Sequence, residues 1–245
     1  FSVTATGTAT LTYQWKKNGS NITGATSSSY TISSATTTDT GTYTCYITNS
    51  CGNTTSTGAY LTITTPPSVT TNPTALTRCT GTSATFSVTA TGTATLAYQW
   101  KKNGANITAA TSSSYTKSSV AITDTGTYTC YISNSCGNTT STGAYLTVTV
   151  PPSVTANPTA LTRCTGTSAT FSVTATGTAT LAYQWKKNGT NISGATSNSY
   201  TKSSVAITDT GTYTCYISNS CGNTTSTGAY LTVTTPPSVT TNPTA

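Results

Sequence analysis

The chain has 245 residues, of which only 5% are charged, and its formal net charge is +7. It contains no His, Glu or Met, and its three carboxylates are Asp39, Asp124 and Asp209. Lack of histidine excludes Ser–His–Asp triads and most zinc sites. One aspartate per repeat leaves no carboxylate pair for glycoside hydrolysis and no carboxylate-rich calcium site. We therefore expect a protein that is not an enzyme and that carries no cofactor or metal.

The chain is a tandem repeat with a period of 85 residues, because FSVTATGTAT begins at Phe1, Phe86 and Phe171. Only six of 75 positions differ between residues 86–160 and 171–245. The period is too long for a solenoid unit and suits a self-contained domain. We predict a repeat without its first strands at 1–65, whole repeats at 66–150 and 151–235, and the first strand of a following repeat at 236–245.

Short strands separated by turn residues are predicted throughout the second repeat, where apolar and hydroxyl residues alternate. In chain order, we expect strands at 66–73, 75–79, 83–92, 95–104, within 106–120, at 124–134 and at 139–149. Turns are expected at Gly81, at Asn103–Gly104 and at 135–138. Pro151 and Pro152 leave almost no linker before the next repeat and fix the backbone, so neighbouring domains should be stiffly coupled.

Two motifs indicate which kind of all-β domain these strands form. DTGTYTC occupies 124–130 and recurs at 39–45 and 209–215, and YQWKKNG occupies 98–104. A tyrosine two residues before a cysteine, with a tryptophan upstream, resembles the immunoglobulin superfamily, closest to its I-set. Within that superfamily the chain looks like the tandem repeats of bacterial surface proteins. The resemblance implies an all-β array of immunoglobulin-like sandwiches, with these aromatic residues in the cores: Trp15, Trp100, Trp185, Tyr43, Tyr128 and Tyr213.

The predicted core of the second domain consists of Phe86, Val88, Leu96, Trp100, Val120, Ile122, Tyr128, Cys130, Ile132, Leu146 and Val148. Val88 stands where the family usually carries a partner cysteine. Cys45, Cys130 and Cys215 are therefore expected to be buried, inert free thiols. Lys117 and Lys202 occupy a normally inward position that holds Ile32 in the first copy, so each must extend to solvent or pair. A Lys–Asn isopeptide bond is an alternative. Its formation needs a nearby carboxylate, and each repeat has only one, the aspartate that opens the DTGTYTC motif.

The remaining cysteines lie at the ends of the domains in the topology that the resemblance implies. Cys79 would lie at the lower end of its domain and Cys136 at the upper end, over about 20 Å apart for strands of this length. A disulfide needs Cα atoms within about 7 Å, so these two cannot pair within one domain. We expect an interdomain bond between Cys79 and Cys221. By the same argument Cys51 and Cys136 would bond preceding domains and Cys164 a following one, forming a ladder that resists bending and stretching.

The surface offers candidate modification sites but little sign of nucleic-acid or membrane contact. Glycosylation triplets begin at Asn21, Asn53, Asn106, Asn138, Asn191 and Asn223, and at Asn18 and Asn188, although such triplets arise by chance in a Thr-rich chain. One Lys–Lys pair per repeat, as at Lys16 and Lys17, is a weak basic signal and favours a solvated turn over nucleic-acid binding. No apolar run is long enough to span a membrane. Eight cysteines indicate an oxidising compartment, outside the cell or at its surface.

The near-identical loops of the repeats favour a structural role, because binding modules usually diverge in their loops. We expect the shaft of an extracellular filament or surface fibre, whose partners are further copies joined head to tail. The alternative is a cell-surface adhesin that binds a carbohydrate or host-surface protein by avidity, with Tyr98 and Tyr131 exposed to the sugar. The favoured interpretation of those two tyrosines is that they simply pack on the strand surfaces.

The positions of the ends predict a longer head-to-tail polymer. The chain begins within a strand at Phe1 and closes with the strand sequence 236–245. Two arrangements remain open: one continuous polypeptide, or separate chains in which the last strand of one completes the first domain of the next.

Overall fold

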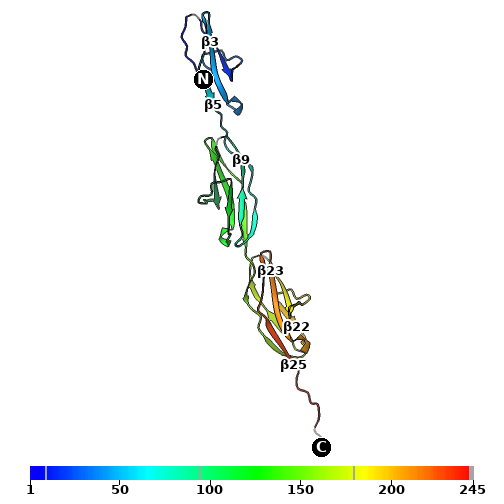
Figure 1. The fold of residues 1–245 in the computed structure, drawn as a ribbon. Coiled ribbons are helices and arrows are strands. Elements are labelled where there is room, and N and C mark those ends of the chain that lie inside the picture. The colour runs from blue at the N-terminus through cyan, green and yellow to red at the C-terminus, as the bar shows by residue number, and fades with distance from the viewer. Residues whose placement is uncertain (9, 94, 179, 243–245) are drawn as a thin grey trace.

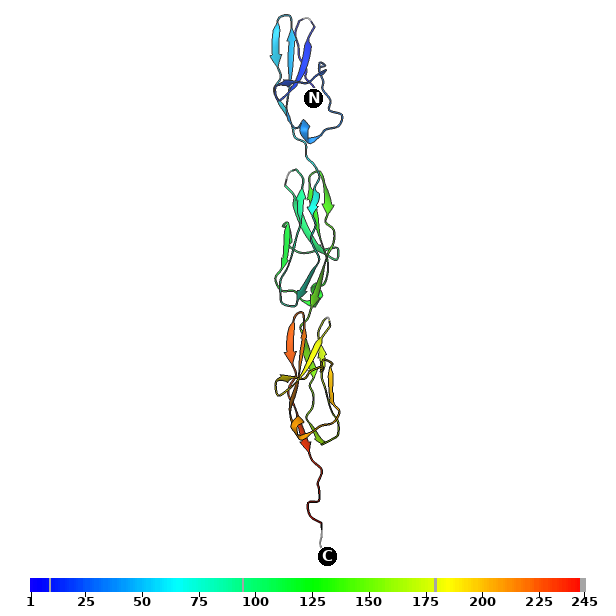
Figure 2. The ribbon, with the colours of Figure 1, turned by 90° about the vertical axis from the view of Figure 1, so that its right-hand side faces the viewer.

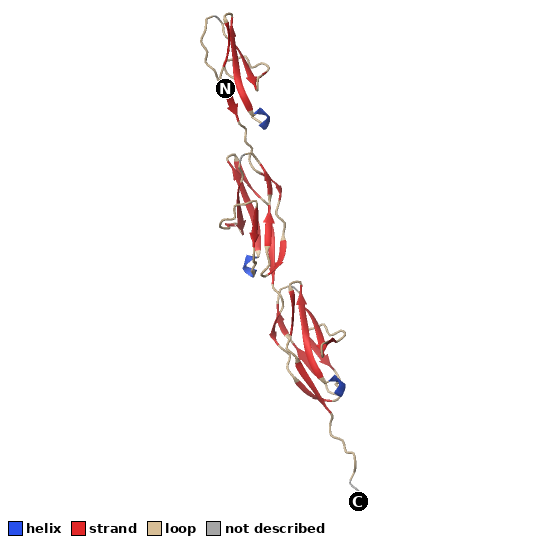
Figure 3. Cartoon of the chain, viewed as in Figure 1, coloured by secondary structure: helices blue, strands red, loops and turns tan. Residues whose placement is uncertain are grey.

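A computed structural model describes residues 1–8, 10–93, 95–178 and 180–242. Figures 1 and 2 show three β domains that follow one another along one axis, with residues 235–242 leading away from the third. Strands make up each domain, and the only helical elements in the described part are single 3₁₀ turns (Figure 3). The predicted all-β tandem array is confirmed.

The second domain shows the complete set of elements. A mixed sheet has the order β11-β10-β13-β15-β7, with β14 also paired to β13, and the facing layer contains the pairs β12–β8 and β6–β9. The bounds are β6 (Ser68–Thr71), β7 (Leu76–Cys79), β8 (Ala84–Ser87), β9 (Thr89–Thr91), β10 (Ala97–Lys102), β11 (Ala105–Asn106), β12 (Ser114–Lys117), η2 (Ile122–Asp124), β13 (Gly126–Asn134), β14 (Gly137–Thr140) and β15 (Ala144–Thr149).

The third domain repeats this arrangement. Its elements are β16 (Ser153–Ala156), β17 (Leu161–Cys164), β18 (Ala169–Ser172), β19 (Thr174–Thr176), β20 (Ala182–Lys187), β21 (Thr190–Asn191), β22 (Ser199–Lys202), η3 (Ile207–Asp209), β23 (Gly211–Asn219), β24 (Gly222–Thr225) and β25 (Ala229–Thr234). Strands β7 and β17 both pair in parallel with the last strand of their own domain.

The first domain contains β1 (Thr12–Lys17), β2 (Ser20–Asn21), η1 (Thr37–Asp39), β3 (Gly41–Asn49), β4 (Gly52–Thr55) and β5 (Ala59–Leu61). In residues 1–65, apart from residue 9, no strand takes the place that β7 and β17 hold in the other domains. Ala59 is exposed and Leu61 half-buried as a result, whereas Leu146 and Leu231 are fully buried.

Local sequence explains the main strand boundaries. Asn103 and Gly104 both have positive φ, +49° and +85°, which is the geometry of the tight turn between β10 and β11. The expected strand 83–92 divides at Val88, so that β8 pairs with β12 and β9 with β6. The expected strand 139–149 also divides: β14 continues the hairpin with β13, and β15 pairs with β13 further along and with β7 on its other side.

The core of each complete domain is an aromatic stack over a buried thiol. Trp100 and Cys130 are fully buried and face each other in register between β10 and β13, and the rings of Phe86 and Tyr128 stack at 4.5 Å. The six aromatic residues expected in the cores are all at most 3% exposed. The prediction for Ile122 was wrong, because it lies on the 3₁₀ turn with 46% of its surface exposed.

Removal of the tryptophan should destabilise the second domain selectively. Trp100→Ala would leave a cavity in a closed aromatic core, so its unfolding free energy should fall by about 3–5 kcal/mol. Calorimetry of the full chain would resolve this change as one early transition. Tyr145→Ala, at a position that is 51% exposed, is the control and should barely shift melting. Unchanged melting of the Trp100 variant would contradict the assigned core.

Candidate functional site: the domain corner and the junction between domains

The corner before strand β13 is held by one tyrosine and one aspartate. The Tyr128 hydroxyl donates to the Asp124 carbonyl oxygen at 2.9 Å, and the Asp124 carboxylate accepts from the backbone N–H of Ala121 at 2.8 Å. The same tyrosine bond occurs at Tyr43 and Tyr213. The aspartate therefore braces a turn, and this corner offers no second carboxylate for acid–base chemistry.

Loss of the corner bond should weaken a domain without emptying its core. Tyr128→Phe leaves the partly buried Asp124 carbonyl without this donor, and we expect a loss of about 1–3 kcal/mol in unfolding free energy. Tyr131→Phe, on the outward side of the same strand, serves as the matched control. Equal melting temperatures for the two variants would show that the corner bond contributes nothing measurable.

Lys117 pairs with the corner aspartate. Its ammonium lies 3.7 Å from the Asp124 carboxylate, and Lys202 repeats this with Asp209. The lysine side chain remains 40% exposed, so it both reaches solvent and pairs, and the pair contributes at most about 1 kcal/mol. The partner in the structure is a carboxylate rather than the asparagine that an isopeptide bond would need.

The thiols of Cys45, Cys130 and Cys215 are fully buried and unbonded to one another. Cys130 packs in the same cluster as Val88. Burial raises the pKa of the Cys130 thiol to about 11 and also raises the pKa of Cys45 and Cys215. Because the thiolate is the reactive form, these cysteines should resist alkylation while the domains are folded.

The buried thiol predicts a loss of stability at alkaline pH. An unfolded Cys130 ionises near its usual pKa of 9.0, whereas the folded one ionises near 11. Stability is thus unaffected below about pH 9 and falls as the pH rises from about 9 to about 11, because the unfolded state releases its proton first. Tyr128 acts with the same sign between its usual pKa of 10.0 and about 12.

Melting temperature measured across this pH range checks that prediction. The curve for Cys130→Ala should fall less steeply between about pH 9 and 11 than that of the unmodified chain. Parallel curves would mean that ionisation of this thiol is not linked to folding.

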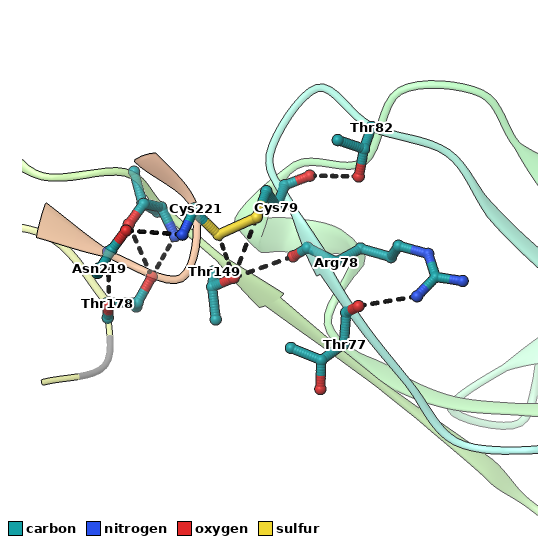
Figure 4. Close-up of a disulfide and its surroundings, with 9 residues drawn as sticks. Thr77, Arg78, Cys79, Thr82, Thr149, Thr178, Asn219 and Cys221 are labelled. Carbon is teal, nitrogen blue, oxygen red and sulfur yellow. Dashed lines mark hydrogen bonds between the residues drawn. A yellow bond between two sulfur atoms is a disulfide. The ribbon is translucent and has the colours of Figure 1, made fainter. Parts of the chain in front are cut away.

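A disulfide joins the second and third domains (Figure 4). It links Cys79 to Cys221 with a Cα–Cα distance of 5.5 Å, which is the pairing expected from the sequence. Parallel pairing of β7 with β15 sets Cys79 beside Thr149, the last residue before the chain leaves the domain. Cys221 lies in the turn between β23 and β24, at the near end of the third domain.

Asn219 ties this turn to the linker. Its side-chain amide donates to the carbonyl oxygens of Val150 at 2.8 Å and Thr178 at 2.9 Å, and its oxygen accepts from the backbone N–H of Cys221 at 2.8 Å. The Val150 N–H donates to the Thr178 hydroxyl. The junction is thus held by the linker, by Asn219 and by the disulfide. Sequence reasoning missed Asn219, although an asparagine two residues before this cysteine recurs in every repeat.

The first junction has the same hydrogen bonds without the disulfide. Asn134 donates to the carbonyl oxygens of Thr65 and Thr93 at 2.7 and 2.8 Å and accepts from the Cys136 N–H at 2.9 Å. The Cys136 sulfur lies 2.5 Å from the Thr64 hydroxyl, as Cys221 lies beside Thr149. Cys51, Cys136 and Cys164 are exposed and unbonded in the described residues, so their bonds to further domains stay predictions.

The six main glycosylation candidates are exposed. Asn106 is opposite Lys101, and Asn138 is opposite Ser133, so both lie on the outer face of the main sheet. Asn18 and Asn188 differ, because they adopt positive φ in tight turns and their side-chain oxygens accept from Thr42 and Thr212. Glycosylation at the exposed positions stays a prediction.

The tyrosines that the adhesin hypothesis needs are less accessible than that hypothesis requires. Tyr98 and Tyr131 are both half-buried. Tyr98 packs against the core, and the Lys101 ammonium lies 5.1 Å from the centre of the Tyr131 ring. The favoured interpretation, that both tyrosines pack on the strands, agrees with this burial, and Tyr98 shares the inward side of its strand with Trp100.

The immunoglobulin-domain family model matches the chain three times, over residues 1–49, 66–134 and 151–219. These matches cover more than half of the chain, and each spans the tryptophan, the corner and the buried cysteine described above. The chain therefore belongs to the immunoglobulin-domain family and is a tandem array of its domains.

Solved structures share the fold at low identity. A three-domain I-band fragment from titin is 22% identical, with a TM-score of 0.70 over 95% of this chain and 90% of the fragment. Immunoglobulin domains 1–4 of Sidekick-1 are 21% identical, with a TM-score of 0.57 over 91% of this chain and 68% of theirs. Extracellular domains 3–5 of Drosophila OTK are 20% identical, with a TM-score of 0.51 over 91% and 85% of the two chains. No curated protein matches the chain.

Neither a metal cluster nor a membrane helix is found in the described ranges. They hold no group of three or more His, Cys, Asp or Glu side chains that could bind a metal ion. No helix among them has the length and hydropathy required to cross a bilayer.

Proposed function

We propose that this chain is a non-catalytic structural repeat of an extracellular filament or surface fibre, of the kind found on bacterial cells. Near-identical immunoglobulin-like domains, stacked end to end, provide length and stiffness. Its partners are further copies of the same repeat, joined head to tail.

The observation that carries this proposal is the repeated junction. The same asparagine bonds fix the linker at Thr65 and at Val150, and two prolines follow each time. Prolines restrict the backbone, and the asparagine holds the turn of the following domain against the linker. A disulfide adds a covalent link at the second junction, and such bonds persist in oxidising surroundings. Relative domain orientation is thus specified, as a stiff fibre requires.

An adhesin is the second candidate, and the outer face of the main sheet favours it. In the first domain a depression on this face is lined by Gln14, Lys16, Asn21, Tyr46 and Thr48. The lysine-over-tyrosine contact recurs in all three domains. An aromatic ring among amide and hydroxyl groups could contact a sugar, and three copies would add avidity.

The bend at each junction distinguishes a stiff shaft from a flexible string of domains. Negative-stain electron microscopy of the oxidised chain should show straight particles, with a narrower spread of angles at the second junction than at the first. Reductant should make the two distributions alike, while Cys164→Ser should change neither. A broad spread of angles at the disulfide-bonded junction would contradict the proposed shaft.

Two further measurements separate the fibre from the adhesin. The fibre predicts filaments of uniform width in native material and no specific signal when the chain is applied to a glycan array. Specific, saturable sugar binding that is lost in a Tyr46→Ala, Tyr131→Ala, Tyr216→Ala variant would favour the adhesin instead.

A further inference from the structure

The disulfide links two segments that each run along the length of a domain. The second domain begins at Thr65 and Pro66, beside the turn that holds Asn134 and Gly137. From there β6 and β7 lead to Cys79, which lies beside Thr149 where the chain leaves the domain. Residues 66–79 therefore connect the two ends of the second domain directly.

The third domain offers a matching segment on the other side of the bond. Cys221 lies at the end nearest the second domain, where its neighbour Asn219 holds Val150. Strands β24 and β25 then lead to Thr234, which pairs with Cys164 at the far end. The last part of the third domain therefore also connects that domain's two ends.

We propose that the Cys79–Cys221 disulfide carries tension past residues 80–220, so that the second and third domains cannot extend while it is intact. A pull along the array would follow β6 and β7, cross the two sulfur atoms and continue along β24 and β25. Each strand segment already spans its domain, so tension along this path need not pull a strand out of a sheet.

Without the bond, tension takes a different course through both domains. It would enter the second domain at β6 and leave at β15, which places the parallel pairing of β7 with β15 in shear, from Leu76 opposite Leu146 to Cys79 opposite Thr149. The matching pairs in the third domain, β17 with β25, would be loaded in the same way. Hydrogen bonds rather than a covalent bond would then resist the pull.

The length that the bond withholds follows from its position in the sequence. The two cysteines are 142 residues apart, and an extended chain spans at most about 3.3–3.6 Å per residue. Reduction should therefore release roughly 470–510 Å of extra extension at high force. Both cysteines are half-buried rather than enclosed. A dithiol can therefore reach them, transferring two electrons and two protons to give two thiols while it closes to its own disulfide.

The first domain provides an internal reference. Its junction with the second domain has no disulfide in the described residues, so it lies in the path of tension under both conditions. It should extend at the same force with and without reductant.

Single-molecule force spectroscopy of the full chain, held at its two ends, tests the proposal. The oxidised chain should show extension of the first domain alone, and a reductant added in place should allow two further domain extensions that total roughly 470–510 Å. Equal total extension before and after reduction would overturn the proposal, as would extension of three domains in the oxidised chain.

Serine variants separate the effect of the bond from that of the reagent. Cys79→Ser and Cys221→Ser should each behave like the reduced chain without any reductant. Cys164→Ser, at the equivalent position of the third domain, should behave like the unmodified oxidised chain. Circular dichroism checks that each variant is folded, and reduction of the unmodified chain provides the same comparison if one is not.

The meaning of this shielding in a fibre rests on the proposed function, whereas the force measurement does not. If the domains are shielded but the chain never forms filaments, the proposed tension path holds and the proposed fibre function is wrong. If the chain forms filaments but its domains extend despite the disulfide, the fibre function holds and the tension path is wrong.

Discussion

The parallel pairing of β7 with β15 is the constraint on which the junction depends. It sets Cys79 level with Thr149, the residue at which the chain leaves the second domain. The linker then passes through Val150 to two prolines, and Asn219 binds the Val150 carbonyl oxygen from the third domain. Cys221, two residues further on, is thereby brought to Cys79. A cysteine at the end of an edge strand becomes an interdomain link because the fold delivers both partners to one place.

Within the described residues, the second and third domains each pack a core without a disulfide of their own. Val88 and Cys130 share a core with Trp100, Phe86 and Tyr128, and the corner bond from Tyr128 closes the turn before the long strand β13. Aromatic stacking and burial provide the cohesion within a domain. The chain thus uses its disulfide between domains rather than inside them, where it acts on orientation and on the response to tension.

The sequence predicted most of this because its strongest signals are periodic. The tryptophan, the corner tyrosine and the buried cysteine follow from fixed spacings within each repeat. The pairing of Cys79 with Cys221 follows from the immunoglobulin-like topology, which places Cys79 at the lower end of one domain and Cys221 at the adjoining upper end of the next. Alternation alone could not place Ile122, because the 3₁₀ turn that carries it lies outside the strand pattern. Nor could it show that Val88 divides one strand between two partners, or that Asn219 reaches the linker, since these depend on how distant segments meet.

Peptide mapping of the chain under non-reducing conditions tests the central claim most directly. Proteolysis without reductant, followed by mass spectrometry, should yield a crosslinked peptide that contains Cys79 and Cys221, with Cys130 recovered as a free thiol. A crosslink from Cys79 to Cys136 or to Cys130 would contradict this account of how the domains are joined.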